Sequence, residues 1–267
     1  MRMSWNLGRI AGINVFLHPS LLLLLAYFGA MQGGVESILL VAAVFGCVLL
    51  HEFGHALTAR QFGIETEDIT LYPIGGVARL RRLPRAPGAE LLITLAGPAV
   101  NLAIALALGV ALVAGAVVGI WQVLPLAGFV RLLMYVNLVL AAFNLIPAFP
   151  MDGGRVLRAA LSGWLGRLRA TEIAASVGQV LAVLFGVYSL LHGELIHVAL
   201  AAFIYFAART ELAHVASEEQ QRTYANAPHQ GIWTAPPGYR WIRRGQGLWQ
   251  LAPINVSVND QEPIRWL

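Results

Sequence analysis

Long apolar runs constrain this chain of 267 residues more than any other feature. Of its residues, 58% are hydrophobic and only 12% are charged, whereas soluble domains carry about 25% charged residues. A helix needs about 20 apolar residues to cross a hydrocarbon layer of about 30 Å. Six runs approach that length, and we expect each of them to form a transmembrane helix: residues 16–31, 38–62, 91–120, 126–146, 173–191 and 195–208. The sequence therefore predicts an all-α polytopic membrane protein and excludes disordered and nucleic-acid-binding classes.

The arginines indicate how these helices are oriented. All 18 basic residues are arginine. With the N-terminus in the cytoplasm, the three outer segments, 32–37, 121–125 and 192–194, contain no arginine, and Arg131 alone lies toward the outer side. Because basic residues concentrate in cytoplasmic loops, we expect a multi-pass protein of the cell membrane with both termini in the cytoplasm.

Two stretches and the tail depart from this helical pattern. Residues 8–19 and 69–80 alternate in the manner of short β-strands. Because non-helical backbone near a bilayer must be buried in protein or line a wet cavity, we expect these strands to border a functional chamber, with an interfacial hairpin that binds no ligand as the alternative. The composition becomes polar near residue 217. We therefore expect a membrane-embedded core over residues 1–214 and a small cytoplasmic appendage over residues 215–267, either β-rich or partly ordered.

The most informative motif, His51-Glu52-Phe53-Gly54-His55, lies inside the second run. Histidines four residues apart project from one helical face and can bind one Zn²⁺, while the intervening glutamate can act as general base on a metal-bound water. Zinc lowers the pKa of that water toward about 7. Ionisable side chains within a membrane indicate a functional site. The motif therefore predicts a zinc hydrolase centre, with polar contacts between helices as the alternative.

A catalytic zinc usually takes three protein ligands and a water molecule. Asp152 follows Asn144-Leu-Ile-Pro147 in a segment that proline and glycine interrupt, so its carboxylate is expected on irregular backbone at membrane depth. His51 lies about 20 Å from the outer end of its run, at 1.5 Å per residue. The fourth run ends near the same cytoplasmic side, so Asp152 can meet the two histidines there.

The motifs His-Glu-x-x-His and Asn-x-x-Pro-x-x-x-x-Asp-Gly together resemble those of the site-2 protease family of intramembrane zinc metalloproteases, peptidase family M50. The resemblance implies that His51, His55 and Asp152 bind one Zn²⁺ per chain. It implies that Glu52 is the catalytic base and that Asn144 holds the substrate or the developing oxyanion. The expected reaction is hydrolysis of a peptide bond in or near a transmembrane segment.

The resemblance covers about residues 8–209 and includes features similar to the six-helix branch, namely Leu-Gly-Arg-Ile-Ala-Gly-Ile at the start, Gly75-Gly76, and Ala96-Gly97-Pro98 with Asn101. It implies regulated intramembrane proteolysis of a single-span membrane protein, such as a membrane-anchored transcriptional regulator. Many members of this branch carry paired regulatory nucleotide-binding domains after the last helix. The tail is too short for them, and there is no room for an inserted PDZ domain, so we expect a core without either. The sequence makes no prediction about the oligomeric state.

Three other functions compete with this hypothesis. A metal-ion transporter would use the same His and Asp side chains as a transit site, but it would not need Glu52, and the chain has no repeated halves. A catalytically inactive scaffold is disfavoured because every residue that the chemistry needs is present. A membrane zinc protease that acts on soluble peptides would differ in substrate class. For an unwound membrane substrate, either strand segment could bind the extended peptide by edge pairing.

Overall fold

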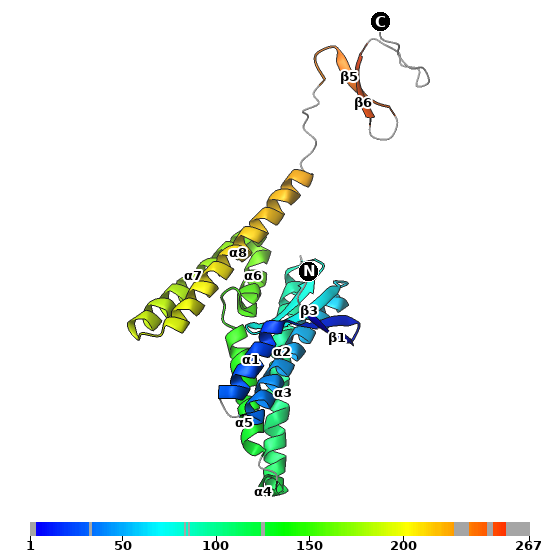
Figure 1. Cartoon of the computed structure of the whole chain (residues 1–267). Helices are drawn as coiled ribbons and strands as arrows, with labels where there is room; N and C mark the ends of the chain where they lie inside the picture. Colours follow the sequence, from blue (N-terminus) through cyan, green and yellow to red (C-terminus); the bar gives the residue numbers. More distant parts are fainter. Residues whose placement is uncertain are drawn as a thin grey trace. The chain divides into compact units, whose positions relative to one another are not determined.

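The computed structural model describes residues 4–31, 34–82, 84, 86–123, 126–226, 235–244 and 248–254. The chain is mostly helical, and five helices are long and apolar enough to cross a membrane (Figure 1). They are α2 (Val35–Gln61), α3 (Pro87–Val117), α5 (Ala127–Asn144), α7 (Arg167–Leu191) and α8 (Leu195–Asn226). The prediction of a multi-pass, mostly helical membrane protein is thereby confirmed.

The helices differ from the expected runs in four places. The run at residues 16–31 contains a shorter helix, α1 (Pro19–Met31), of 13 residues, because a strand occupies the residues before it. The last helix, α8, continues well beyond the expected end at residue 208. Two short helices were not predicted, α4 (Ile120–Val123) and α6 (Asp152–Leu165). Helix α6 is amphipathic, so a search for continuous apolar runs does not detect it.

Each of the two alternating stretches forms a β-hairpin. The strands are β1 (Trp5–Ile10), β2 (Ile13–Leu17), β3 (Thr66–Tyr72) and β4 (Gly75–Leu80), and they form one sheet in that order. The two hairpins are antiparallel, whereas β2 and β3 pair in parallel, with Leu17 opposite Leu71. The first hairpin turns through Ala11 and Gly12, both with positive φ. The chain thus brings its N-terminal strands together with the strands that follow α2.

The sheet packs against the part of α2 that carries the histidine motif. The buried cluster between them consists of Ile13, Val15, Phe53, Ala56 and Ile69. On β4, an edge strand, a Cβ atom added to Gly76 would lie 2.5 Å from Cγ of Glu52. The backbone of β4 therefore lies directly against the Glu52 side chain, at a distance that only glycine permits.

A buried arginine joins three helices around α6. Arg158 is only 1% exposed. Its Nε donates to Glu90 of α3 at 2.7 Å, and its Nη1 donates to Glu211 of α8 at 2.7 Å. The guanidinium also lies 5.2 Å from the centre of the Phe149 ring. These contacts tie α6, which begins at Asp152, to helices that are distant in sequence.

Replacing this arginine tests the value of the network. We expect Arg158→Met to destabilise the protein by about 3–5 kcal/mol, because the Glu90 carboxylate is left buried without its partner. Thermal unfolding in detergent measures the loss. The double variant Arg158→Met/Glu90→Gln should recover part of it, and Arg81→Met, whose partner Glu65 is exposed, should change little. A double variant no more stable than the single one would contradict this explanation.

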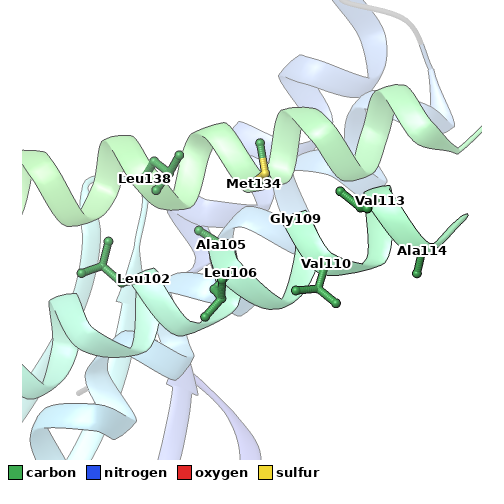
Figure 2. A pocket seen from close by; sticks show the side chains of 9 residues that line it. All are labelled: Leu102, Ala105, Leu106, Gly109, Val110, Val113, Ala114, Met134 and Leu138. Atoms are coloured by element: carbon green, nitrogen blue, oxygen red, sulfur yellow. The ribbon is translucent and has the colours of Figure 1, made fainter. Parts of the chain in front are cut away.

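Helices α3 and α5 leave an apolar groove of about 710 Å³ between them (Figure 2). Gly109 of α3 and Met134 of α5 face each other there. The nine residues that line the groove carry no titratable side chain. The groove therefore offers a surface to lipid chains or to other helices and has no catalytic groups.

Residues 217–267 form a second compact unit. Its described residues comprise the end of α8 and an antiparallel hairpin of β5 (Tyr239–Arg244) and β6 (Leu248–Pro253). The appendage expected over residues 215–267 remains a prediction, because residues 227–234, 245–247 and 255–267 lie outside the described part of the chain.

Candidate metal centre

The two histidines of α2 and the aspartate of α6 lie together. The Nε2 atoms of His51 and His55 are 3.0 Å apart. Oδ2 of Asp152 lies 3.1 Å from each of them. These residues belong to two motifs about a hundred positions apart, and the fold places their potential ligand atoms in one compact group.

The size of this group fits a zinc ion. Zinc binds histidine nitrogen and carboxylate oxygen at about 2.0–2.2 Å. Three atoms separated by 3.0 to 3.1 Å leave a point about 2 Å from all of them, at the distance these ligands need. One carboxylate and two imidazoles are also a ligand set found in catalytic zinc sites, which keep a fourth position for water.

The other ring nitrogen of each histidine is hydrogen-bonded to α3. Nδ1 of His55 donates to the Ile93 carbonyl at 2.7 Å, and Nδ1 of His51 lies 2.5 Å from Oδ1 of Asn101. A histidine that donates from Nδ1 presents its unprotonated Nε2 to a metal, and such outer partners are the usual way to fix ring and tautomer. Helix α3 thus orients both potential ligands.

Asp152 does not lie on irregular backbone, as the sequence predicted, but is the first residue of α6. The irregular segment is residues 145–151, just before it. A Cβ atom on Gly153 would lie 2.0 Å from the Ile146 carbonyl oxygen, and one on Gly154 would lie 2.6 Å from the Phe149 nitrogen. The two glycines therefore let the first turn of α6 pack against this segment, which fixes the Asp152 carboxylate.

Neighbouring charge favours the ionised form of Asp152. Burial raises the pKa of its carboxyl group, but when the two imidazoles are protonated, hydrogen bonds and charge from His51 and His55 outweigh burial and hold that pKa well below its ordinary value. A carboxylate in this state is ready to act as a metal ligand.

Glycines also allow α2 and α3 to approach each other at the centre. A Cβ atom on Gly54 would lie 2.7 Å from the Ala96 carbonyl oxygen. One on Gly97 would lie 2.3 Å from Nε2 of His55 and 2.7 Å from Nε2 of His51. The next residue, Pro98, interrupts the helical hydrogen bonding of α3. The Ala96-Gly97-Pro98 segment thus forms a wall of the site that tolerates no side chain at its middle position.

The remaining two predicted residues lie in different surroundings. Glu52 is partly buried, on the same helix as the histidines and against Gly76. Nδ2 of Asn144 donates to the Leu140 carbonyl of its own helix at 3.0 Å, and no hydrogen bond between described residues joins Asn144 to the three potential ligands. The motif alone did not identify the contacts of Asn101 and Gly97, because they depend on how α2 packs against α3.

Comparisons with known proteins agree with this arrangement. The family model of peptidase family M50 matches residues 39–126 and 115–185, together more than half of the chain. A zinc metalloprotease of Methanocaldococcus jannaschii is 36% identical over 90% of this chain and 68% of its own length. The Rip3 protein of Mycobacterium tuberculosis is 33% identical over 82% of this chain and 61% of its own.

A solved structure extends the likeness to the fold. The site-2 protease from Methanocaldococcus jannaschii superposes with a TM-score of 0.59 at 35% identity, over 78% of this chain and 95% of that structure. Together with the group of His51, His55 and Asp152, these matches support a metalloprotease, and none of them favours a metal transporter. The chain belongs to peptidase family M50 and is a zinc metalloprotease of the site-2 protease type.

Proposed function

We propose that this protein hydrolyses a peptide bond in or near the transmembrane segment of a single-span membrane protein, in regulated intramembrane proteolysis. The observation that carries the proposal is the group of His51, His55 and Asp152, held among helices that are long and apolar enough to span a bilayer. A membrane-anchored regulator is the expected kind of substrate. Nucleic acid is not an expected partner.

The proposed chemistry divides the work among few side chains. When bound by His51, His55 and Asp152, one Zn²⁺ supplies an acidified water and polarises the scissile carbonyl. Glu52 accepts the proton of the attacking water and later returns it to the leaving amine. Asn144 donates a hydrogen bond to the substrate or the developing oxyanion. Its NH₂ group carries two N–H donors, so the one that is not bonded to the Leu140 carbonyl can donate to the substrate.

The proposed topology has six crossings in the cell membrane, with α1 as the short sixth span and both termini in the cytoplasm. The distribution of arginine supports it, because the expected outer segments contain none. Cysteine accessibility at positions 2 and 222, measured in sealed vesicles of known orientation, tests both termini.

The first experiment is cleavage of a panel of single-span membrane proteins by the purified protein in liposomes. We expect the protein to bind one zinc and to cut within a span. We expect Asp152→Ala to lose both, because two imidazoles alone leave the ion one protein ligand short. Asp260→Ala, in the tail, serves as the matched control. Undiminished zinc binding by Asp152→Ala would contradict the proposed ligand set, and cleavage of soluble peptides alone would contradict the substrate class.

The substrate must be extended at the site, because the carbonyl groups of an intact helix are already hydrogen-bonded. Strand β4 supports this part of the proposal. It is an edge strand, so one side of its backbone has no strand partner among the described residues, and Gly76 brings that strand against Glu52. An extended peptide added to this edge by β-pairing would pass beside the proposed base.

Proline substitutions along residues 74–78 test the edge. Because proline removes a backbone N–H, we expect these variants to cleave more slowly while they keep zinc. Gly76→Pro does not count as support, because its ring would also displace Glu52. Leu7→Pro, at a bulge of the opposite edge strand β1, should leave cleavage unchanged. The pairing hypothesis would be wrong if every proline variant over residues 74–78 cleaved at the parent rate.

A further inference from the structure

The two histidines of the centre are oriented by different kinds of acceptor. Nδ1 of His55 bonds a backbone carbonyl, that of Ile93, which can only accept. Nδ1 of His51 bonds the side-chain amide of Asn101. An amide offers an acceptor at one end and a donor at the other, so it can pair with either tautomer of the imidazole. Something else must therefore fix which end of the Asn101 amide faces His51.

That constraint comes from α5. Nδ2 of Asn101 donates to Oδ1 of Asn137 at 2.9 Å. Nδ2 of Asn137 donates in turn to the carbonyl oxygen of Leu133 at 2.9 Å. Each of the two amides donates from its NH₂ group on one side and accepts at its oxygen on the other. The direction of one hydrogen bond therefore sets the direction of the next.

The direction can be deduced from its last acceptor. The Leu133 carbonyl only accepts, so Asn137 must present its NH₂ group there and its oxygen to Asn101. Asn101 must then present its NH₂ group to Asn137 and its oxygen to His51. Only a proton on Nδ1 satisfies that oxygen. In the neutral imidazole, which binds a metal, Nε2 of His51 is then unprotonated and directed at Asp152 and the metal position.

Burial makes this order strict. Both Asn101 and Asn137 are 0% exposed. A reversed amide would place two acceptors or two donors against each other where water cannot relieve the conflict, and buried polar groups without partners are costly. The Sγ atom of Cys47, 3.3 Å from Nδ2 of Asn137, is a weak acceptor and is not needed to set the direction.

We propose that Asn101 and Asn137 are positioning residues, which hold His51 as the Nδ1–H tautomer through a relay that ends on the Leu133 carbonyl. The relay connects α2, α3 and α5, so one metal ligand is oriented by a helix that contributes no ligand. This inference rests on the proposed metal centre and adds to it the residues that prepare His51 for the metal.

Zinc affinity, measured by competition with a chelator on the full chain in detergent, is the first test. Loss of an outer partner typically weakens metal binding 10–100-fold, and we expect that loss for Asn101→Leu. Asn137→Leu should lose less, because His51 keeps its direct partner. Asn101→Asp should bind zinc more tightly than Asn101→Leu, because its carboxylate still accepts from Nδ1, and less tightly than the parent, because its second oxygen then faces Oδ1 of Asn137. Cys47→Ala should bind zinc within twofold of the parent.

A second readout separates positioning from general damage to the fold. In zinc-free protein labelled with ¹⁵N-histidine, at a pH high enough to keep the imidazole neutral, the resonance of His51, assigned with His51→Gln, reports which ring nitrogen carries the proton. We expect Nδ1–H in the parent and in Asn101→Asp, and a mixture of tautomers in Asn101→Leu and Asn137→Leu. Disturbed packing without the relay would lower affinity and leave the tautomer unchanged.

The outcomes distinguish a failure of the relay from a failure of the proposed metal centre on which it rests. A parent protein that binds no zinc overturns the metal centre itself. A parent that binds one zinc, with His51 protonated on Nε2 or with Asn101→Leu and Asn137→Leu both within twofold of its affinity, overturns the relay alone. Loss of affinity and a mixed tautomer in the two leucine variants, with recovery in Asn101→Asp, support it.

Discussion

Glu52→Gln is expected to lower the cleavage rate by about 10²–10⁴-fold, the usual contribution of a general acid–base group, while one zinc per chain is retained. Glutamine has the shape of glutamate but accepts no proton at neutral pH. Glu52 is not among the three grouped ligand atoms, so metal binding should not depend on it. Zinc content and single-turnover cleavage of the substrate found in the panel measure both effects.

Glu65→Gln is the matched control, because Glu65 is exposed and pairs with exposed Arg81. It should cleave at the parent rate. If Glu52→Gln kept zinc and cleaved within threefold of the parent, Glu52 would not be the base. If it lost zinc, the residue would contribute to the metal centre in a way that its position does not explain.

Gly97→Ala is expected to abolish zinc binding and cleavage together. The added methyl would lie 2.3 Å from Nε2 of His55 and 2.7 Å from Nε2 of His51, closer than carbon and nitrogen atoms can approach. Neither imidazole can yield easily, because Nδ1 of each is hydrogen-bonded to α3 itself. We expect a loss of zinc affinity beyond the 10–100-fold of an outer partner, measured by chelator competition.

Gly109→Ala, the same substitution elsewhere in α3, provides the control. A methyl on Gly109, also in α3, would meet Sδ of Met134 at 3.5 Å, an ordinary van der Waals contact. Gly109→Ala should therefore keep zinc and cleavage, and both variants should be compared for thermal unfolding. If Gly97→Ala bound zinc as tightly as Gly109→Ala, the close approach of α3 to the histidines would not exist in the working protein.

Local patterns explain what the sequence could predict. The spacing of His51 and His55 determines a shared helical face wherever the helix lies, and long apolar runs determine spans by length alone. Asp152 could be selected because few aspartates exist and only one follows a break near the right membrane depth. These inferences need no knowledge of how the helices pack.

The parts that could not be predicted depend on packing. Helix α6 has arginines among its apolar residues, and Arg158 becomes buried only because Glu90 and Glu211 approach it from other helices. The resemblance to the six-helix branch included Asn101, but its contacts with His51 and Asn137 depend on how α2 and α5 pack on either side of α3. The resemblance also included Gly97, but the reason for a glycine there is the close approach of α3 to the two histidines, which the sequence does not show.

The pairing of β2 with β3 requires both strands to lie on the same side of the membrane. One strand leads into α1 and the other follows α2, so an even number of crossings must separate them if they share one sheet. Helix α2 has 27 residues and is about 40 Å long, while α1 has 13 and is about 20 Å long. Because both helices start from the same short connection, we expect α1 to cross whenever α2 does.

Helix α1 is too short to cross alone, so if both helices cross, the strands of the sheet must reach into the membrane. They descend beside the final turns of α2, so the turn at residues 73–74 lies about as deep as Glu52, next to which Gly76 packs. If α1 crosses the membrane as proposed, the outer N–H and C=O groups of β4 lie below the membrane surface. Lipid tails offer no hydrogen bonds to such groups. An unwound polypeptide, in contrast, can form hydrogen bonds along the whole outer edge of β4.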